Sequence, residues 1–473
     1  MKRRFFVKMS ALISFAWVAL KRFPMGKQVK AMDTSVHLAP GSNAYEACLS
    51  GLVNGTAAAQ MPRQIRQPRS TKEIQTAIHD AAALNLKISV RGGSHSAHCA
   101  SNNSLMLDLA ASYKEITISG DRVRIQAGAN MGAVVQALSP YGRTIPVGTH
   151  TTPGFGLLLM GGIGHLSRIL GLTIDAIEEL HGFRSNGEPF KLTATTGEHE
   201  DWKLMRGAAI FLGVVTEATL RTFPRYDLRV CRELFTLDQL SDEIANAENF
   251  PASAACSMIL GFPQDHPHAM GLIYAVAETN RQESMIALDR LKAPWQAIVA
   301  GQEQLPPFEM PQLDGRVESI LQASVHRMRR TRTWVYSISL PNGLAEKLGP
   351  ILKQSINSAP NRDCRIDLQH VGGLVNTIPE ESSAYLGRSA EWSIVITGVW
   401  PGTDGIMAKR VREWADTLFK KLIPLAIHYY IVQRHPGEWS YPTETRLAYG
   451  PIWEQLTRRK AAWDSLELLP ALI

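Results

Sequence analysis

The stretch "IPVGTHTTPGFGLLLMGGIGHLSRILGLTID", residues 145–175, decides how this sequence is interpreted. Its glycines are dense: Gly148, Gly154, Gly156, Gly161, Gly162, Gly164 and Gly171. Glycine has no side chain, so the backbone can lie close to a bound molecule and offer it amide N–H groups. A flat, anionic dinucleotide is the kind of ligand that such a surface fits.

A second glycine turn lies upstream, in "VRGGSHSAHCAS" at residues 90–101. The apolar run "LKISV" predicts a strand that stops at Arg91, and His95 lies in the bare turn that follows. An imidazole there can act as a nucleophile toward an electrophilic carbon, or it can be a turn histidine with a solvated tip. His95 and His98 are three residues apart, but no helix or further ligand cluster supports a metal site there, so we expect no metal.

A third element, "MRGAAIFLGVVTEATLRTFP" at residues 205–224, turns from Arg206 and Gly207 into a predicted strand. No GxGxxG motif forms the turn between a strand and a helix, which weakens a Rossmann interpretation.

The formal net charge of +7 is concentrated at one end of the chain. Eight lysines and arginines, and no acidic residue, lie in the first 31 residues, so the remaining chain is close to neutral. This distribution does not point to nucleic acid. The five cysteines are odd in number and form no CxxC pair, so neither a disulfide framework nor a zinc site is indicated.

The N-terminus, "MKRRFFVKMSALISFAWVALKRFPMGKQVKA", has the organisation of an export signal. Arg3 and Arg4 begin a segment that resembles a twin-arginine motif, and an 11-residue apolar run follows. That run is too short to span a bilayer comfortably, so we expect no stable membrane insertion. We predict a signal peptide at 1–31 and an exported, periplasmic or secreted protein. The alternative is a basic segment at a membrane surface on a cytoplasmic protein.

The predicted elements divide the rest of the chain into three parts. Strands and helices alternate from about residue 45 to 225, which favours an α+β nucleotide-binding domain. From 226 to 425, longer amphipathic helices alternate with strand-like runs such as "WSIVITGVW", which predicts an antiparallel sheet with covering helices. Residues 426–473 form a helical tail that we expect to pack back on the first domain.

The three glycine-bearing elements together resemble the berberine-bridge-enzyme-like branch of the FAD-linked oxidases, in the vanillyl-alcohol oxidase superfamily. "VRGGSHSAHCASNNSLMLDL" is similar to the family's Arg-Gly-Gly-Gly-His-Ser turn and the strand after it, and residues 145–175 are similar to its Gly-Gly-Gly-x-Gly-x-Leu motif. The resemblance runs from about residue 45 to the end. It implies a PCMH-type FAD-binding domain followed by a substrate domain.

The resemblance also implies the residues of the FAD site. His95 corresponds to the histidine that is joined covalently to the flavin 8α-methyl group. The other cofactor-binding residues that it implies are Arg91, Gly92, Gly93, Ser94, Ser96, Gly148, Gly154, Gly161, Gly162, Gly164, Leu166, Val214 and Val215.

Three departures from the family pattern bear on the chemistry. His150 stands where members with two flavin links have a cysteine, so we expect one covalent link only. His150 is then either an acid/base group near the flavin or a polar wall. Met160 replaces the first glycine of the triple, which crowds that loop. Pro153 stands where many family oxidases have a valine that leaves room for O2.

The family chemistry is transfer of a hydride from a substrate C–H to flavin N5, while a base removes a proton from an adjacent O–H or N–H. Family members often use a tyrosine as that base, which makes Tyr430 and then Tyr441 the first candidates. Gln369 or His370 can line the substrate pocket, and strand alternation should send only one of them inward; we favour Gln369.

Two classes of function remain open. The first is an oxidase of an alcohol, sugar or secondary metabolite with O2 as the acceptor, or a dehydrogenase that reacts poorly with O2. The second is a flavoprotein cyclase or isomerase whose net chemistry is redox-neutral. The sequence does not name the substrate or the oligomeric state.

Overall fold

The computed structural model describes residues 35–196, 199–263, 266–291, 295–301, 331–433 and 441–472. The expected signal peptide at 1–31 lies outside these ranges, as do Arg434 and His435 beside the tyrosine candidates. Within the described ranges, no helix is both long enough and apolar enough to cross a bilayer. The chain from Thr34 onward forms one compact unit.

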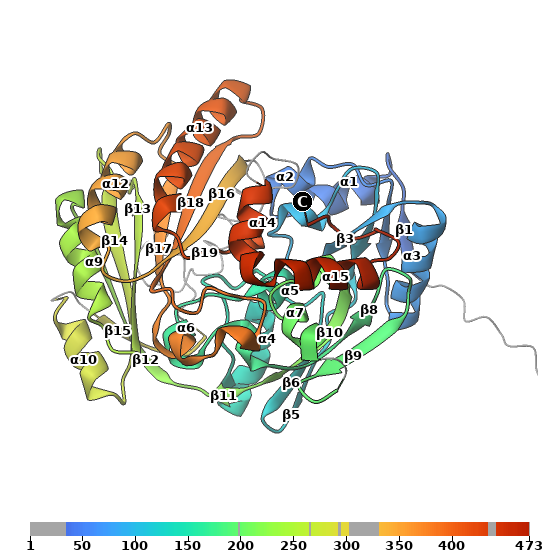
Figure 1. Cartoon of the computed structure of the whole chain (residues 1–473), viewed down its shortest axis with the longest axis horizontal. Coiled ribbons are helices and arrows are strands. Elements are labelled where there is room, and N and C mark those ends of the chain that lie inside the picture. The colour runs from blue at the N-terminus through green and yellow to red at the C-terminus, as the bar shows by residue number, and fades with distance from the viewer. Residues whose placement is uncertain are drawn as a thin grey trace, which may run out of the picture. The chain divides into compact units, whose positions relative to one another are not determined.

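The first half of the chain builds two sheets that carry the glycine-rich turns (Figure 1). The four-stranded sheet has the order β1-β2-β4-β3, and β2 and β3 both run parallel to β4. Its strands are β1 (Val36–Leu38), β2 (Gln64–Gln67), β3 (Lys87–Arg91) and β4 (Ser104–Asp108). The five-stranded sheet is antiparallel, in the order β5-β6-β10-β8-β9. Its strands are β5 (Ile116–Ser119), β6 (Arg122–Gln126), β8 (Ile177–Phe183), β9 (Pro189–Thr193) and β10 (Val214–Arg221).

Short helices fill the connections of this half. They are α1 (Asn43–Ser50), α2 (Gly55–Ala58), α3 (Thr71–Ala83), α4 (Met131–Leu138), α5 (Phe155–Met160), α6 (Ser167–Leu170), α7 (His199–Met205) and α8 (Ala209–Leu212). The start of α3 shows why such a helix begins where it does. Ser70 Oγ accepts from the Glu73 N–H at 3.3 Å, which satisfies one of the free donors at the helix start.

The second half is one antiparallel sheet of eight strands, in the order β15-β12-β14-β13-β17-β18-β16-β19. The strands are β12 (Asp227–Phe235), β13 (Ala254–Gly261), β14 (Met270–Glu278), β15 (Trp295–Val299), β16 (Thr331–Leu340), β17 (Arg365–His370), β18 (Trp392–Pro401) and β19 (His428–Tyr429). A two-stranded pairing of β7 (Arg143–Thr144) with β11 (Phe223–Pro224) lies just before this sheet in the chain.

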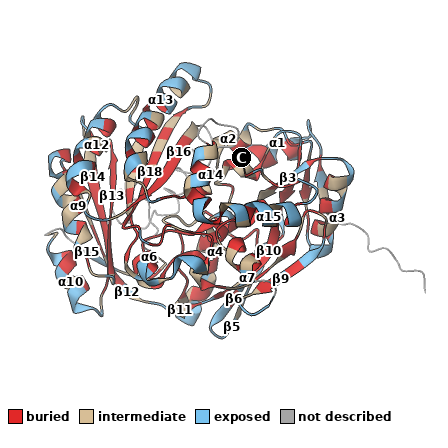
Figure 2. Ribbon diagram, viewed as in Figure 1, coloured by how far each residue is buried: buried red, intermediate tan, exposed pale blue. Residues whose placement is uncertain are grey.

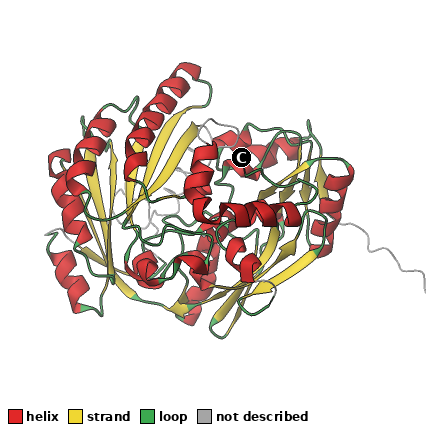
Figure 3. Ribbon diagram, in the orientation of Figure 1, coloured by secondary structure: helices red, strands yellow, loops and turns green. Residues whose placement is uncertain are grey.

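Helices cover one face of the eight-stranded sheet and leave the other toward the first half (Figure 3). The covering helices are α9 (Leu240–Glu248), α10 (Gln282–Asp289), α12 (Ala345–Asn357) and α13 (Gly405–Leu422). Their sheet-facing sides are buried and their outer sides exposed (Figure 2). The predicted α+β class, with an antiparallel sheet under helices, is confirmed.

The C-terminal tail lies against the first half of the chain (Figure 1). It consists of α14 (Tyr441–Tyr449), α15 (Trp453–Trp463) and a short terminal segment. The Tyr449 hydroxyl donates to the Gly207 carbonyl at 2.7 Å, and the Ile88 N–H of β3 donates to the Leu468 carbonyl at 2.7 Å.

A buried charged cluster joins the two halves. Arg168 lies within the glycine-rich stretch, and its Nη1 donates to Glu391 Oε1 at 2.5 Å, next to β18. His370 Nε2 lies 2.7 Å from the same oxygen. The Cys256 N–H contacts His370 Nδ1 at 3.0 Å, so Nδ1 is the acceptor and Nε2 carries the proton that Glu391 accepts. The buried Arg168 charge is therefore paired, which a buried charge requires.

Candidate active site

A cavity of about 1350 Å³ lies between the glycine-rich turns and the inner face of the eight-stranded sheet. The turn after β3, the loop before α5 and the start of β10 form its wall on the first half. Side chains of β13, β16, β17 and β18 form the opposite wall. Most of the residues predicted for the cofactor line it, namely Gly92, Gly93, Ser94, His95, Ser96, Gly154, Val214 and Val215.

The turn that carries His95 is held in shape from several sides. Ser94 adopts a left-handed backbone with φ of 64°, which is uncommon for a residue with a side chain. Arg91 Nε donates to Ser94 Oγ at 2.9 Å. Asn54 donates to this turn twice, from its N–H to the Ser94 carbonyl at 2.9 Å and from Nδ2 to the His95 carbonyl at 3.0 Å. The surrounding structure thus fixes the strained turn before any ligand binds.

The same turn presents unsatisfied donors to the cavity. In the part of the chain that the structure describes, the N–H groups of Gly93, Ser94, His95 and Ser96 have no acceptor. Ser94 is buried and the other three residues are partly buried, and amide groups so shielded are normally paired with protein, water or a ligand. Gly156, across the cavity, adds room: a Cβ there would meet nothing within 4 Å. Bare amides facing open space suit an anionic ligand with carbonyl oxygens.

His95 is neutral and has one committed nitrogen. Burial lowers its pKa to about 4. Its Nε2 lies 2.6 Å from Thr152 Oγ1, which leaves Nδ1 as the other reactive nitrogen.

Six predicted cofactor residues lie outside the cavity lining, and their contact with the cofactor stays a prediction. Arg91 Nη1 contacts Asp108 Oδ2 at 3.1 Å. Gly162 and Gly164 use their N–H groups within the chain, on Tyr430 Oη and Ser167 Oγ. The other three have packing roles: a Cβ on Gly148 would strike Leu157, a Cβ on Gly161 would strike Tyr430, and Leu166 is buried in a separate cluster with Leu170 and Tyr274. These glycines therefore allow the loop to fold tightly.

His150 lines the cavity and is also neutral. Burial lowers its pKa to about 3, and the positive charge of Arg365 lowers it further. His165 behaves similarly, because burial and then Arg232 lower its pKa to about 3. Arg365 belongs to β17. Its effect on the pKa of His150 shows that this strand lies close to the turns of the first half.

Strand β17 sends alternate side chains into the cavity, as a strand must. Arg365, Asp367 and Gln369 line it, whereas His370 points to the other side and stacks on Trp392 at 4.8 Å between ring centroids. The structure therefore places Gln369 inward, which is the residue that the sequence favours.

Asp367 was not singled out from the sequence. Its side chain is 13% exposed, and it pairs across the sheet with Ile259 and Val395. Burial raises its pKa, while Arg365, whose Nε donates to Asp367 Oδ2 at 3.1 Å, works in the opposite direction. The strand alternation in "RIDLQH" that predicts an inward Gln369 also predicts an inward Asp367. The sequence therefore contained the information needed to find Asp367.

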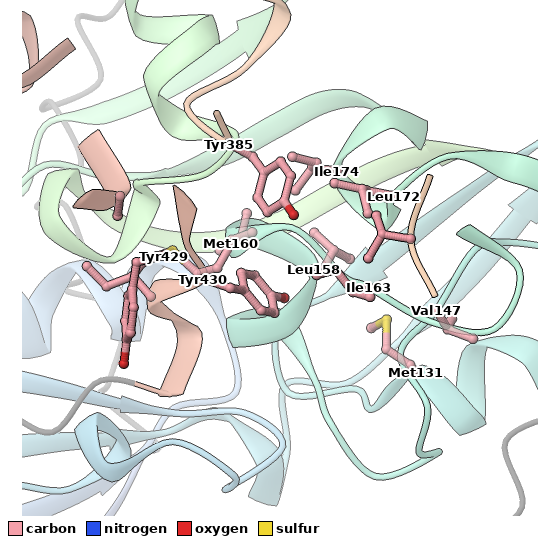
Figure 4. Packing of buried hydrophobic residues seen from close by; sticks show 14 of the residues in the cluster. Met131, Val147, Leu158, Met160, Ile163, Leu172, Ile174, Tyr385, Tyr429 and Tyr430 are labelled. Carbon is pink, nitrogen blue, oxygen red and sulfur yellow. The ribbon is translucent and has the colours of Figure 1, made fainter. Parts of the chain in front are cut away.

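The tyrosine candidates are poorly placed for taking a proton. Tyr430 lines the cavity, but its hydroxyl accepts from the Gly162 N–H at 2.9 Å, and burial raises its pKa to about 12. Figure 4 shows the Tyr430 ring packed beside Leu158 and Ile163, with the Tyr429 hydroxyl directed elsewhere. The Tyr441 hydroxyl donates to the Ala471 carbonyl at 2.6 Å, within the tail. The tyrosine base stays a prediction, and the raised pKa of Tyr430 argues against it.

Known proteins share this arrangement. A family described as "FAD binding domain" matches residues 62–193, which hold both glycine-rich turns. An FAD-linked oxidoreductase of Dictyostelium discoideum is 23% identical over 86% of this chain and 86% of its own length. The chain therefore carries an FAD-binding domain and is similar to FAD-linked oxidoreductases.

Solved structures share the fold of this chain. A chitooligosaccharide oxidase superposes with a TM-score of 0.77 at 17% identity, covering 92% of this chain and 96% of its own. A berberine-bridge-enzyme-like protein of Physcomitrella patens also gives 0.77, at 18% identity, with 93% and 96% covered. Both likenesses establish the PCMH-type FAD-binding fold.

The residues of the cavity fit FAD. The unsatisfied amides of the His95 turn match an acceptor-rich anionic cofactor, and the open space at Gly156 admits its bulk. Met160, which replaces a family glycine, is buried and lines the cavity.

Proposed function

We propose that this protein oxidises a hydroxyl-bearing carbon of a neutral carbohydrate or alcohol, with Asp367 as the base. The observation that carries the proposal is a buried carboxylate in the same cavity as the FAD-binding turn. Bound FAD would supply the hydride acceptor. Asp367 would take the hydroxyl proton on Oδ1, because Oδ2 is engaged by Arg365 and Oδ1 has no hydrogen-bond partner among the described residues.

The other titratable groups of the cavity are weaker candidates for the base. A base works best when its pKa lies near the operating pH. His150 and His165, with pKa values of about 3, bind a proton too weakly, and Tyr430, with a pKa of about 12, keeps its own proton at neutral pH. Burial raises the pKa of Asp367 above that of an ordinary aspartate, which makes its carboxylate a stronger base.

The charges on the substrate wall favour an uncharged substrate. Two arginines, Arg362 and Arg365, are matched there by two aspartates, Asp363 and Asp367. A neutral polyol needs no further counter-ion in such a site. The neighbour named chitooligosaccharide oxidase supports the same substrate class.

We further propose that FAD is bonded covalently to this chain through His95 alone. Support comes from the neutral imidazole with one uncommitted nitrogen, and from His150 at the position of the family's second link. O2 is the proposed electron acceptor. A dehydrogenase with another acceptor is the alternative, and production of H2O2 during turnover distinguishes them.

Export of the folded, FAD-loaded protein is also proposed, on the basis of the twin-arginine-like segment at residues 3–8. N-terminal sequencing of the mature protein from its native host should then begin near Met32. An intact Met1 in the cytoplasmic fraction would contradict export.

The experiment that tests the proposed reaction is anaerobic mixing of the protein with D-glucose, cellobiose, chitobiose and xylobiose. At least one sugar should bleach the flavin absorbance. If none does, a carbohydrate substrate is contradicted.

A further inference from the structure

One buried polar side chain of the cavity has no partner within the protein. His165 lines the cavity, is 5% exposed, and directly follows Gly164 in the glycine-rich stretch. Within the described chain, neither of its ring nitrogens has a hydrogen-bond partner. A buried polar group in that state costs free energy, so we expect a bound group to complete its hydrogen bonds.

Other buried polar side chains of the cavity are satisfied by the protein itself. Four buried serines line it, and each hydroxyl contacts another group of the chain: Ser89, Ser94, Ser257 and Ser337. The Tyr430 hydroxyl accepts from the Gly162 N–H at 2.9 Å. The unsatisfied nitrogens of His165 are therefore a feature of this position and not a general property of the cavity wall.

The imidazole of His165 is held in place from both halves of the chain. Its ring centroid lies 4.4 Å from that of Tyr274 on β14, and the two rings are tilted by 45°. On the loop side, the Gly164 N–H donates to Ser167 Oγ at 2.9 Å, and a Cβ on Gly164 would lie 1.8 Å from the Val147 carbonyl oxygen. A ring fixed in this way offers its hydrogen bond in one direction, which suits a rigid ligand.

His165 belongs to a group of three imidazoles that line the cavity on the FAD-binding side. After burial and Arg365, His95 and then His165 lower the pKa of His150, so His150 lies close to both. His95 is the proposed attachment point of the flavin 8α-methyl group. That methyl group lies on the apolar edge of the flavin ring system, and the carbonyl oxygens and ring nitrogens lie at the opposite edge. A ring attached at His95 therefore directs its polar edge away from His95, where a hydrogen-bond donor is required.

We propose that His165 donates a hydrogen bond to the polar edge of the flavin ring and thereby raises the reduction potential of bound FAD. The proposal rests on the proposed attachment at His95 and needs no particular substrate. Burial and Arg232 keep His165 neutral, so it has one N–H to donate. Reduction places negative charge on the polar edge, and a hydrogen bond to a charged acceptor is stronger than one to a neutral acceptor. His165 would therefore stabilise the reduced flavin more than the oxidised flavin.

The reduction potential of the FAD-loaded, full-length protein tests this interaction without a substrate. Anaerobic titration against a reference dye measures it. His165→Phe keeps a ring beside Tyr274 and removes the N–H donor. The equilibrium constant for its reduction should fall about tenfold, which is about 30 mV for a two-electron couple. His165→Gln keeps an N–H donor and should restore most of the difference.

Two further variants make the comparison specific. His79→Phe changes an exposed histidine of α3 and should leave the potential as in wild type. His165→Leu also lacks the donor and is smaller than Phe, so it tests the proposal if the Phe ring displaces the flavin. If both donor-free variants lose flavin and His165→Gln keeps it, the hydrogen bond to FAD is supported.

Three results would overturn the proposal. The first is an unchanged potential in flavin-bearing His165→Phe and His165→Leu. The second is an equal fall in His165→Gln and His165→Phe, which would reflect altered packing and not a lost donor. The third is an unchanged potential together with weaker sugar binding by the dithionite-reduced variants, which would assign His165 to the substrate.

The attachment at His95 is tested separately by acid precipitation of wild type. A colourless pellet would contradict the covalent link. The potentials of the same variants, with FAD bound without that link, would still decide the role of His165.

Discussion

His95 Nε2 lies 2.6 Å from Thr152 Oγ1 across the cavity wall. This contact joins the two glycine-rich elements that the sequence brought to attention separately. It engages one imidazole nitrogen and leaves Nδ1 available toward the cavity. When the neutral imidazole donates from Nε2 to the Thr152 hydroxyl, its lone pair lies on Nδ1, and this is the tautomer that a nucleophile needs.

The first prediction concerns this pair. Replacement of His95 by Ala should abolish acid-stable flavin, so that acid precipitation gives a colourless pellet. Thr152→Val should reduce the covalently bound fraction, because the tautomer is no longer set, whereas Thr152→Ser should retain it. A yellow pellet from His95→Ala would show that another residue carries the link.

The second prediction concerns Tyr430 and Tyr441, the bases expected from the family pattern. Tyr430→Phe and Tyr441→Phe should each reduce flavin at a rate within about tenfold of wild type, since burial keeps Tyr430 protonated and the Tyr441 hydroxyl donates within the tail. Tyr430→Phe removes the acceptor of the Gly162 N–H, so its Tm should fall. A loss of about 10²–10⁴ in the reduction rate, which is typical of removing a general base, would restore the tyrosine as the base.

The third prediction is a pH dependence. Asp367 must be ionised to accept a proton, so the rate of flavin reduction should fall as the pH drops through its pKa. The groups around Asp367 are Arg365 on its own strand, the neutral His150 opposite, and apolar Ile259 and Val395 on the flanking strands. Arg365 lowers the pKa of Asp367, so Arg365→Gln should move this acid limb to higher pH.

The shift should persist when His150→Gln is combined with Arg365→Gln, because Asp367 and not His150 is the titrating group. If Arg365→Gln does not move the acid limb of the rate profile, Asp367 is not the group that accepts the proton.

The fourth prediction concerns stability. Burial lowers the folded-state pKa of His370 to about 4 and that of His428 to about 3, from 6.5. Below pH 6.5 these histidines therefore bind protons in the unfolded chain but not in the folded chain. The free energy of unfolding falls as the pH drops from 6.5 toward 4. Each histidine contributes up to about 1.4 kcal/mol per pH unit in that window.

Thermal unfolding across this range measures the effect. His428→Gln should flatten the decline in Tm at low pH, and the exposed His79→Gln should leave it as in wild type. Equal slopes in all three proteins would show that His428 is not held neutral.

The sequence predicted the cofactor half well because its signals are local. A run of glycines after a strand predicts a turn without side chains, independently of the rest of the fold. His95 lies in such a turn, as predicted. Which glycines contact the cofactor was less predictable. Close packing requires glycine at three positions: Gly161 against Tyr430, Gly162 against Thr173 and Gly164 against Val147. Of these neighbours, only Tyr430 is distant in sequence.

The base was harder to predict because its properties depend on tertiary contacts. Tyr430 keeps its proton because burial raises its pKa to about 12, although the Gly162 N–H, 268 residues away, lowers that pKa in part. Asp367 owes its environment to Ile259 and Val395 on two different strands. Strand alternation selects the face of β17, but only the folded sheet shows that this face meets the FAD-binding turn.

The most direct test of the central claim is stopped-flow reduction of Asp367→Asn under anaerobic conditions, with the sugar that reduces wild type fastest. The isosteric amide keeps the packing and removes the proton acceptor, so flavin content and Tm should be unchanged and the rate should fall about 10²–10⁴-fold. Asp363→Asn, the exposed carboxylate of the same wall, is the matched control and should react as wild type does. Reduction of Asp367→Asn at the wild-type rate would contradict the account.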